Sequence, residues 1–145
     1  MKRFPILAAT VILCLLAFCG CAPKATPPPT PTIAALPPAG DLEAAARYFV
    51  GLLADGKYAE AAATFEPQMA AAFPTVKLQA TWESVIQKVG ALKGIKEVRL
   101  ANEAGYRIAY VACDFARTPL DMKIVFDGQG RIAGLWFVPA GSGGT

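Results

Sequence analysis

The sequence predicts an α+β domain in which N-terminal helices cover one face of a four-stranded antiparallel sheet. Between residues 41 and 89, apolar side chains recur at spacings of three and four, which indicates amphipathic helices. After Gly94 the pattern changes to four short runs of alternating, β-branched and aromatic residues, which are typical of strands. The connections between these runs are too short for parallel crossovers, so we expect an antiparallel meander.

The chain opens with a segment typical of an export signal. Met1-Lys2-Arg3 is basic, and residues 6–18 form an uncharged apolar run that is shorter than the roughly 20 residues of a membrane-spanning helix. The run ends at Gly20-Cys21, and a small residue before a cysteine resembles the lipobox of bacterial lipoproteins. We therefore expect residues 1–20 to be a lipoprotein signal peptide and Cys21 to be lipidated. An ordinary secretory signal or an uncleaved anchor is the alternative.

This signal implies a membrane-anchored lipoprotein of the cell envelope, facing the periplasm or the exterior. Residues 21–40 hold the lipidated cysteine and a linker with seven of the 12 prolines of the chain. Such a segment favours an extended conformation and suits a passive tether, although a ligand for a proline-recognition module is an alternative. The folded domain is then residues 41–139, and the Gly/Ser-rich residues 140–145 are expected to be a flexible tail.

Three to four helices are expected in the first half of the domain. Asp41 is a helix N-cap, and the first helix runs to about Ala54, where Asp55-Gly56 stops it. Three further helical segments follow, and Gly90 ends the last: residues 57–65, 67–72 and 75–89.

Four strands are expected in the second half, joined by turn-forming residues: 95–102, 106–117, 120–126 and 131–138. The alternation in the third strand places Leu120, Met122, Ile124 and Phe126 on one face, which we expect to be the core face. The opposite face would then carry Asp121, Lys123 and Asp127.

Composition excludes several function classes. The chain has no histidine, which removes the usual general base and the Ser-His and Cys-His nucleophile pairs. Without Lys2 and Arg3 the remaining 12 basic and 11 acidic residues form no basic stripe, so nucleic-acid binding has no electrostatic support. Cys113 is the single cysteine inside the domain and is expected to be a buried apolar residue of a strand. No motif for a metal or another cofactor is present, so none is expected.

Several segments together resemble a bacterial domain of unknown function in the nuclear-transport-factor-2-like, or cystatin-like, superfamily: Tyr48-Phe49, Gly56-Lys57-Tyr58-Ala59-Glu60-Ala61, Trp82-Glu83, and residues 127–137 with their Gly-Leu-Trp-Phe strand. In relatives this domain often precedes an α/β-hydrolase domain. The resemblance implies a curved sheet whose helices close a conical cavity, used by some members for catalysis and by many only for binding or dimerisation.

The residues that would lie near such a cavity are Trp82, Glu83, Tyr106, Tyr110, Asp114 and Trp136. Tyr106, Tyr110 and Asp114 alternate along one strand and therefore share one face. A carboxylate base with tyrosine donors would suit an isomerase-like enzyme, but those groups must flank a substrate instead of lying side by side. Both tryptophans are expected to be core residues, and Glu83 is expected to be solvated.

We therefore expect a non-catalytic binding or interaction domain on a membrane-anchored lipoprotein. Its partner would be a small apolar ligand, a second copy of the chain in a homodimer, or another envelope protein, bound through the sheet face or the cavity. The alternatives are a small cavity enzyme of the isomerase or hydratase kind, and an accessory domain to a separate hydrolase.

Overall fold

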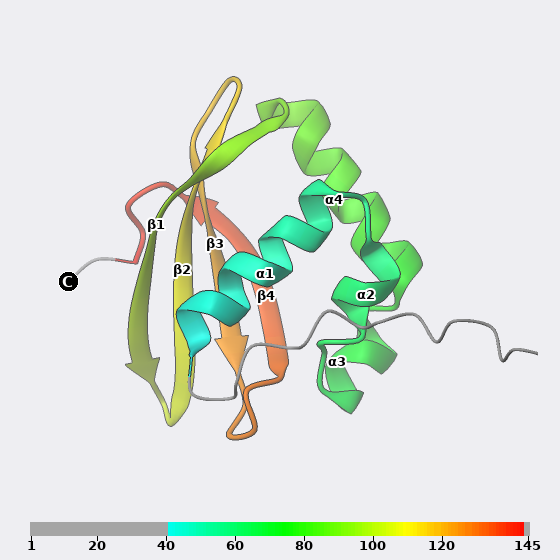
Figure 1. The fold of residues 1–145 in the computed structure, drawn as a ribbon, viewed down its shortest axis with the longest axis vertical. Helices are drawn as coiled ribbons and strands as arrows, with labels where there is room; N and C mark the ends of the chain where they lie inside the picture. Colours follow the sequence, from blue (N-terminus) through cyan, green and yellow to red (C-terminus); the bar gives the residue numbers. More distant parts are fainter. Residues whose placement is uncertain (1–40, 144–145) are drawn as a thin grey trace, which may run out of the picture. The chain divides into compact units, whose positions relative to one another are not determined.

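The computed structural model describes residues 41–143, which form helices followed by an open, antiparallel four-stranded sheet, the α+β arrangement expected from the sequence (Figure 1). The signal peptide, Cys21 and the proline-rich linker lie outside the described residues. Within residues 41–143, no helix has both the length and the apolar character needed to cross a membrane.

The two long helices begin and end where the sequence predicts. α1 (Leu42–Ala54) is capped by Asp41, whose Oδ1 accepts a hydrogen bond of 2.9 Å from the backbone N–H of Ala44. α4 (Thr75–Val89) ends at Gly90, whose φ of 87° lies in the left-handed region. A Cβ at Gly90 would also lie 2.8 Å from the Cβ of Ala116, so both conformation and space require glycine there.

The two short helices are α2 (Tyr58–Ala62) and α3 (Pro67–Ala72). The second helix is shorter than the predicted segment 57–65, because the chain leaves it to form a parallel bridge between Phe65 and Ile132. Backbone hydrogen bonds from Glu66 N to Ile132 O and from Ile132 N to Thr64 O hold this bridge at 2.9 Å each. The last strand therefore begins beside the connection between the short helices.

The sheet is an antiparallel meander in the order β1 (Leu92–Glu103), β2 (Tyr106–Phe115), β3 (Leu120–Phe126) and β4 (Ile132–Pro139). β1 begins three residues earlier than expected, because two register irregularities near Gly94 let the strand continue through the glycine. β2 ends at Phe115 instead of residue 117, since the N–H groups of Ala116 and Arg117 bond to the carbonyls of Ala91 and of Val89, the last residue of α4.

The hydrophobic core lies between the helices and one face of the sheet, here called the inner face. α1 crosses this face, and α2, α3 and α4 lie beside β4 (Figure 1). The largest fully buried core side chains include Phe49, Leu53, Leu78, Met122, Ile124 and Phe126. The prediction that Met122, Ile124 and Phe126 face the core is confirmed.

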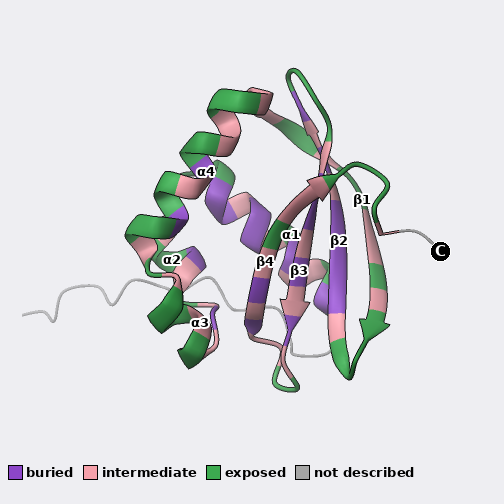
Figure 2. Ribbon diagram, turned by 180° about the vertical axis from the view of Figure 1, so that it is seen from behind, coloured by how far each residue is buried: buried purple, intermediate pink, exposed green. Residues whose placement is uncertain are grey.

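No helix of the described body covers the opposite face of the sheet, here called the outer face (Figure 2). Neighbouring strands bring together residues from alternate positions on this face: Arg99, Glu103, Tyr106, Ile108, Tyr110, Asp121, Lys123, Val125 and Trp136. The uncovered face is where polar side chains and exposed aromatic rings gather.

Candidate functional site

The sheet separates the five pocket residues that the sequence suggested. Trp82 lies on the helix side and is buried, as expected. Tyr106, Tyr110 and Asp114 share the outer face, as their alternation predicts, and Trp136 joins them there. The candidates therefore lie on two sides of the sheet, the outer face and the helix side.

The sequence predicted Trp136 to be a core residue, and this prediction was wrong. Its side chain is 53% exposed, because β4 pairs it with Lys123 on the outer face. The indole ring lies over Gly134, where a Cβ would come within 2.3 Å of Trp136 Cη2. Glycine two residues earlier on the same face thus leaves the space that this exposed ring occupies.

The outer groove has a volume of about 550 Å³. Tyr106 and Trp136, 51% and 53% exposed, are its aromatic walls. Its remaining lining comes from the end of β1, the β1–β2 turn, the strands β2 to β4 and the N-cap of α3: Glu66, Glu103, Ala104, Ile108, Lys123, Val125, Ala133 and Val138. Exposed aromatic rings beside aliphatic side chains make the lining of this groove largely apolar.

A hydrogen-bonded cluster of Glu103, Tyr110 and Lys123 borders the groove. Lys123 Nζ donates to Glu103 Oε2 and Tyr110 Oη donates to Glu103 Oε1, each at 2.9 Å. The ammonium group also lies 5.4 Å from the centre of the Tyr110 ring. The hydrogen bonds from Lys123 and then Tyr110 lower the pKa of Glu103, and the bond to Glu103 raises the pKa of Lys123.

These pKa shifts predict a pH-dependent contribution to stability. A carboxylate with a lowered pKa stabilises the fold above its unfolded pKa of about 4.3, and this contribution is lost as the pH falls through the lower folded pKa. Glu103→Gln should therefore lower the thermal midpoint at pH 7, and its difference from the wild type should shrink below about pH 4. Glu97→Gln, at an exposed site on the same strand, is the control. A difference that stays constant from pH 7 to pH 2 would contradict this account.

The outer face also holds a buried ion pair. Asp121 is 1% exposed, and its Oδ2 accepts hydrogen bonds from Arg99 Nη2 at 2.5 Å and from the backbone N–H of Gly141 at 2.9 Å. Residues 140–143 thus contact the sheet after β4 ends, and a Cβ at Gly143 would lie 2.2 Å from Tyr110 Cγ. Residues 140–143, part of the segment that composition indicated to be a flexible tail, lie against Asp121 and Tyr110 on the outer face.

Ending the chain at Pro139 should therefore lower the free energy of unfolding, which removal of a segment without contacts would not do. It removes the Gly141 N–H from a buried carboxylate, and a hydrogen bond to a charged group contributes about 1.5–3 kcal/mol. We expect a loss of that size in the free energy of unfolding by urea. Ending the chain after Ser142 keeps the bond and is the matched control. A loss below about 0.5 kcal/mol on ending at Pro139 would show that the tail contributes no stability.

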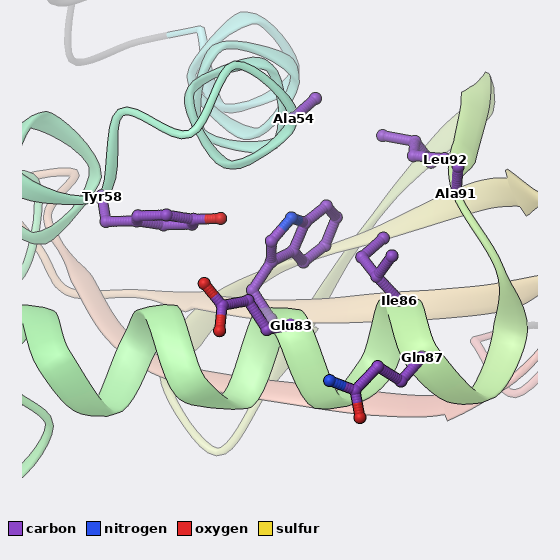
Figure 3. A pocket seen from close by; sticks show the side chains of 8 residues that line it. Ala54, Tyr58, Glu83, Ile86, Gln87, Ala91 and Leu92 are labelled. Atoms are coloured by element: carbon purple, nitrogen blue, oxygen red, sulfur yellow. The ribbon is translucent and has the colours of Figure 1, made fainter.

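The second site is a cleft of about 480 Å³ on the helix side of the sheet (Figure 3). It lies between the end of α1, the start of α2, one side of α4 and the start of β1, and its lining is Ala54, Tyr58, Trp82, Glu83, Ile86, Gln87, Ala91 and Leu92. The Trp82 ring is 6.0 Å from Phe115 and 6.2 Å from Phe137, measured between ring centres, so core aromatics hold its orientation.

The remaining candidate groups for chemistry are engaged or protonated. Asp114 pairs at 3.6 Å with the exposed Lys96 and does not line either site. Cys113 is buried as expected, and its burial, with the charge of Asp121, raises the pKa of the thiol to about 12. No group of three or more potential metal ligands occurs in the part of the chain that the structure describes.

A family model described as "Protein of unknown function (DUF3887)" matches residues 46–135 of this chain. The chain belongs to the DUF3887 family. No curated protein and no solved structure matches the chain. The DUF3887 region runs from α1 into β4 and includes the whole lining of the helix-side cleft, while Trp136 follows its last residue.

Sequence reasoning missed several residues of both sites in this DUF3887 domain. Tyr58 lay within a quoted motif but was interpreted only as part of an apolar stripe. Glu83 was expected near the cavity and solvated, and it is exposed at the cleft that it lines. Glu103 and Lys123 carried a usable signal, because alternation from Tyr110 along paired strands places charged side chains on the same face. The ion pair of Arg99 and Asp121 had no signal in the sequence. The two residues lie on β1 and β3, on either side of β2, and their contact depends on the register of both strand pairs.

Proposed function

We propose that this protein is a membrane-anchored lipoprotein, held by Cys21, whose folded body is a non-catalytic binding module. The outer groove is its interaction surface, and its occupant is a second copy of the chain. The exposure of Tyr106 and Trp136 on a sheet face without covering helices carries this proposal. Large exposed aromatic rings beside aliphatic side chains are typical of interaction surfaces.

The charge of the groove suits a second copy. Lys123 and Glu103 pair with each other, and Glu66 also lines the groove. Two copies related by a two-fold axis present the same patch to each other, so a patch of one charge sign would repel itself. A lysine and carboxylates around one groove allow attraction across the two-fold axis.

The edges of the sheet are less suited to association than its outer face. β1 is an edge strand with register irregularities, and it carries Lys93, Lys96 and Arg99. Charged residues and bulges on an edge strand disfavour pairing with another sheet. At the other edge, the bridge between Phe65 and Ile132 occupies the start of β4. Face-to-face contact through the groove is therefore the favoured geometry.

Two further considerations support binding over catalysis. On the outer face, Asp114, Asp121 and Glu103 each have a basic partner, so none of these carboxylates is set apart as a base in an apolar site. In addition, the resemblance to the nuclear-transport-factor-2-like superfamily fits helices on a curved sheet, and many members of that superfamily use the fold for binding or dimerisation. The superfamily assignment is part of this proposal.

Cys21→Ser tests the anchor. The substituted chain should accumulate as an unprocessed precursor or leave the membrane fraction, because it cannot receive the lipid. The measurement is fractionation with metabolic lipid labelling, and Cys19→Ser is the matched control, which should behave like the wild type. Normal processing and fractionation of the Cys21→Ser chain would contradict the anchor.

Sedimentation velocity of the chain starting at residue 22 tests the interaction surface. A concentration-dependent dimer should form, and Trp136→Lys should weaken association by at least about tenfold, since central aromatic residues dominate interfaces. Val76→Lys, at an exposed position on α4, is the control. A chain that remains monomeric at all concentrations, or a dimer indifferent to Trp136→Lys, would contradict the second copy as occupant of the groove.

A further inference from the structure

The helix-side cleft contains an unpaired donor on an almost fully buried residue. Trp82 is 4% exposed, and its indole N–H donates no hydrogen bond to any residue that the structure describes. Among the described residues, Arg99 Nε on the outer face is the one fully enclosed side-chain nitrogen without a partner, so the Trp82 nitrogen keeps some accessible surface. We place that surface at the cleft that Trp82 lines. A buried indole N–H usually has a partner, and here the cleft is where an acceptor would lie.

The lining divides the cleft into a polar end and an apolar end. Figure 3 shows the Tyr58 hydroxyl pointing into the cleft with the Glu83 carboxylate beside it, while Ile86, Ala91 and Leu92 lie toward the other end. Glu83 Oε1 accepts a hydrogen bond of 2.8 Å from Gln79 Nε2, and this leaves Oε2 without a protein partner. The polar end thus offers two donors, from Trp82 and Tyr58, and one charged acceptor.

This arrangement selects among classes of ligand. Glu83 is the only charged residue in the lining, so carboxylate and phosphate heads are repelled and find no basic partner. An ammonium head would satisfy Glu83 but would present no acceptor to the indole N–H. A primary amide satisfies both sides, because its N–H groups donate to Glu83 and its carbonyl accepts from Trp82 and Tyr58.

We propose that the helix-side cleft binds a small uncharged molecule with an apolar body and an amide head. The head lies at Trp82, Tyr58 and Glu83, and the body lies against Ile86 and Leu92. A volume of about 480 Å³ is within the range of small-molecule sites. This site is on the other side of the sheet from the outer groove, so it does not rest on the function proposed above.

Three probes with the same alkyl chain test the head group: hexanamide, hexylammonium and hexanoate. They are titrated into the ¹⁵N-labelled chain starting at residue 22, which keeps every described residue. The chain has two tryptophans, so its spectrum holds two indole N–H signals, and Trp136→Phe assigns them. Hexanamide should shift the Trp82 indole signal in a saturable way and leave the Trp136 signal in place. Hexylammonium and hexanoate should bind at least about tenfold more weakly.

Variants separate the roles of the polar groups. Tyr58→Phe should weaken hexanamide binding about threefold to tenfold, because it removes one donor without changing the ring. Glu83→Gln should reduce the discrimination against hexanoate about tenfold. Glu60→Gln removes an exposed carboxylate of α2 that does not line the cleft, and it should bind all three probes like the wild type.

Each remaining result overturns the proposal. If no probe shifts the Trp82 signal up to its solubility limit, the cleft holds solvent alone. If hexylammonium binds as tightly as hexanamide or more tightly, the site recognises a cation and the indole N–H is not used. If hexanoate binds equally well, Glu83 does not select the head group.

Discussion

Arg99→Ala is expected to lower the free energy of unfolding by about 3–5 kcal/mol, because it leaves the buried Asp121 carboxylate without its cation. The two side chains meet on the outer face, where Asp121 is 1% exposed and Arg99 29%. The substitution removes the hydrogen bond from Arg99 to Asp121 Oδ2 and leaves the one from the backbone N–H of Gly141. The measurement is urea denaturation at pH 7, with Arg99→Ala, the control variant Lys96→Ala and the wild type in the same buffer.

Lys96→Ala is the matched control for this experiment. Lys96 lies on the same strand as Arg99 and pairs with Asp114 at 3.6 Å, but the side chains of Lys96 and Asp114 are 64% and 37% exposed. An exposed ion pair contributes about 0–1 kcal/mol, so this substitution should have little effect. Equal losses from the two substitutions would contradict the assignment of Arg99 and Asp121 as a structural pair of the sheet.

Replacing each tryptophan by alanine is expected to lower the free energy of unfolding by very different amounts. Trp82→Ala should cost about 3–5 kcal/mol, because the ring is buried against Phe115 and Phe137 and its removal leaves a cavity. Trp136→Ala should cost about 1 kcal/mol or less in the monomer, since half of the ring is already in contact with water.

Thermal unfolding at low protein concentration compares the two variants without a contribution from association. Intrinsic fluorescence provides an independent check, because Trp136→Ala should leave the blue-shifted emission of a buried indole and Trp82→Ala the red-shifted emission of an exposed one. A cost of 3 kcal/mol or more for Trp136→Ala would restore the core interpretation of that residue.

The fold was predictable from the sequence because each of its elements has a local signal. Asp41 and Gly90 mark helix ends through backbone capping, and the alternation of Met122, Ile124 and Phe126 fixes the core face of β3. Such signals depend on a few neighbouring residues. They also placed Tyr106 and Tyr110 correctly on one face of β2.

The two sites were less predictable, because they depend on register and on which face remains uncovered. Trp136 follows an apolar pattern that is typical of core strands, and only its pairing with Lys123 places it outside. In the sequence, Asp121 has the pattern of a solvated strand residue. In the structure, Arg99 and Gly141 both donate hydrogen bonds to its carboxylate. These contacts join residues that are about 20 positions apart in the chain, where no periodic pattern connects them.

Site-specific photo-crosslinking tests the central claim, that the outer groove binds a second copy of the chain. A benzophenone amino acid replaces Trp136 in one variant and the exposed Val76 of α4 in another, each in the full chain in its own membrane. We expect illumination to give a covalent dimer, identified by mass spectrometry, from the variant at position 136 and not from the variant at position 76. An adduct of position 136 with a different protein, no adduct, or equal dimer from both variants would contradict the claim.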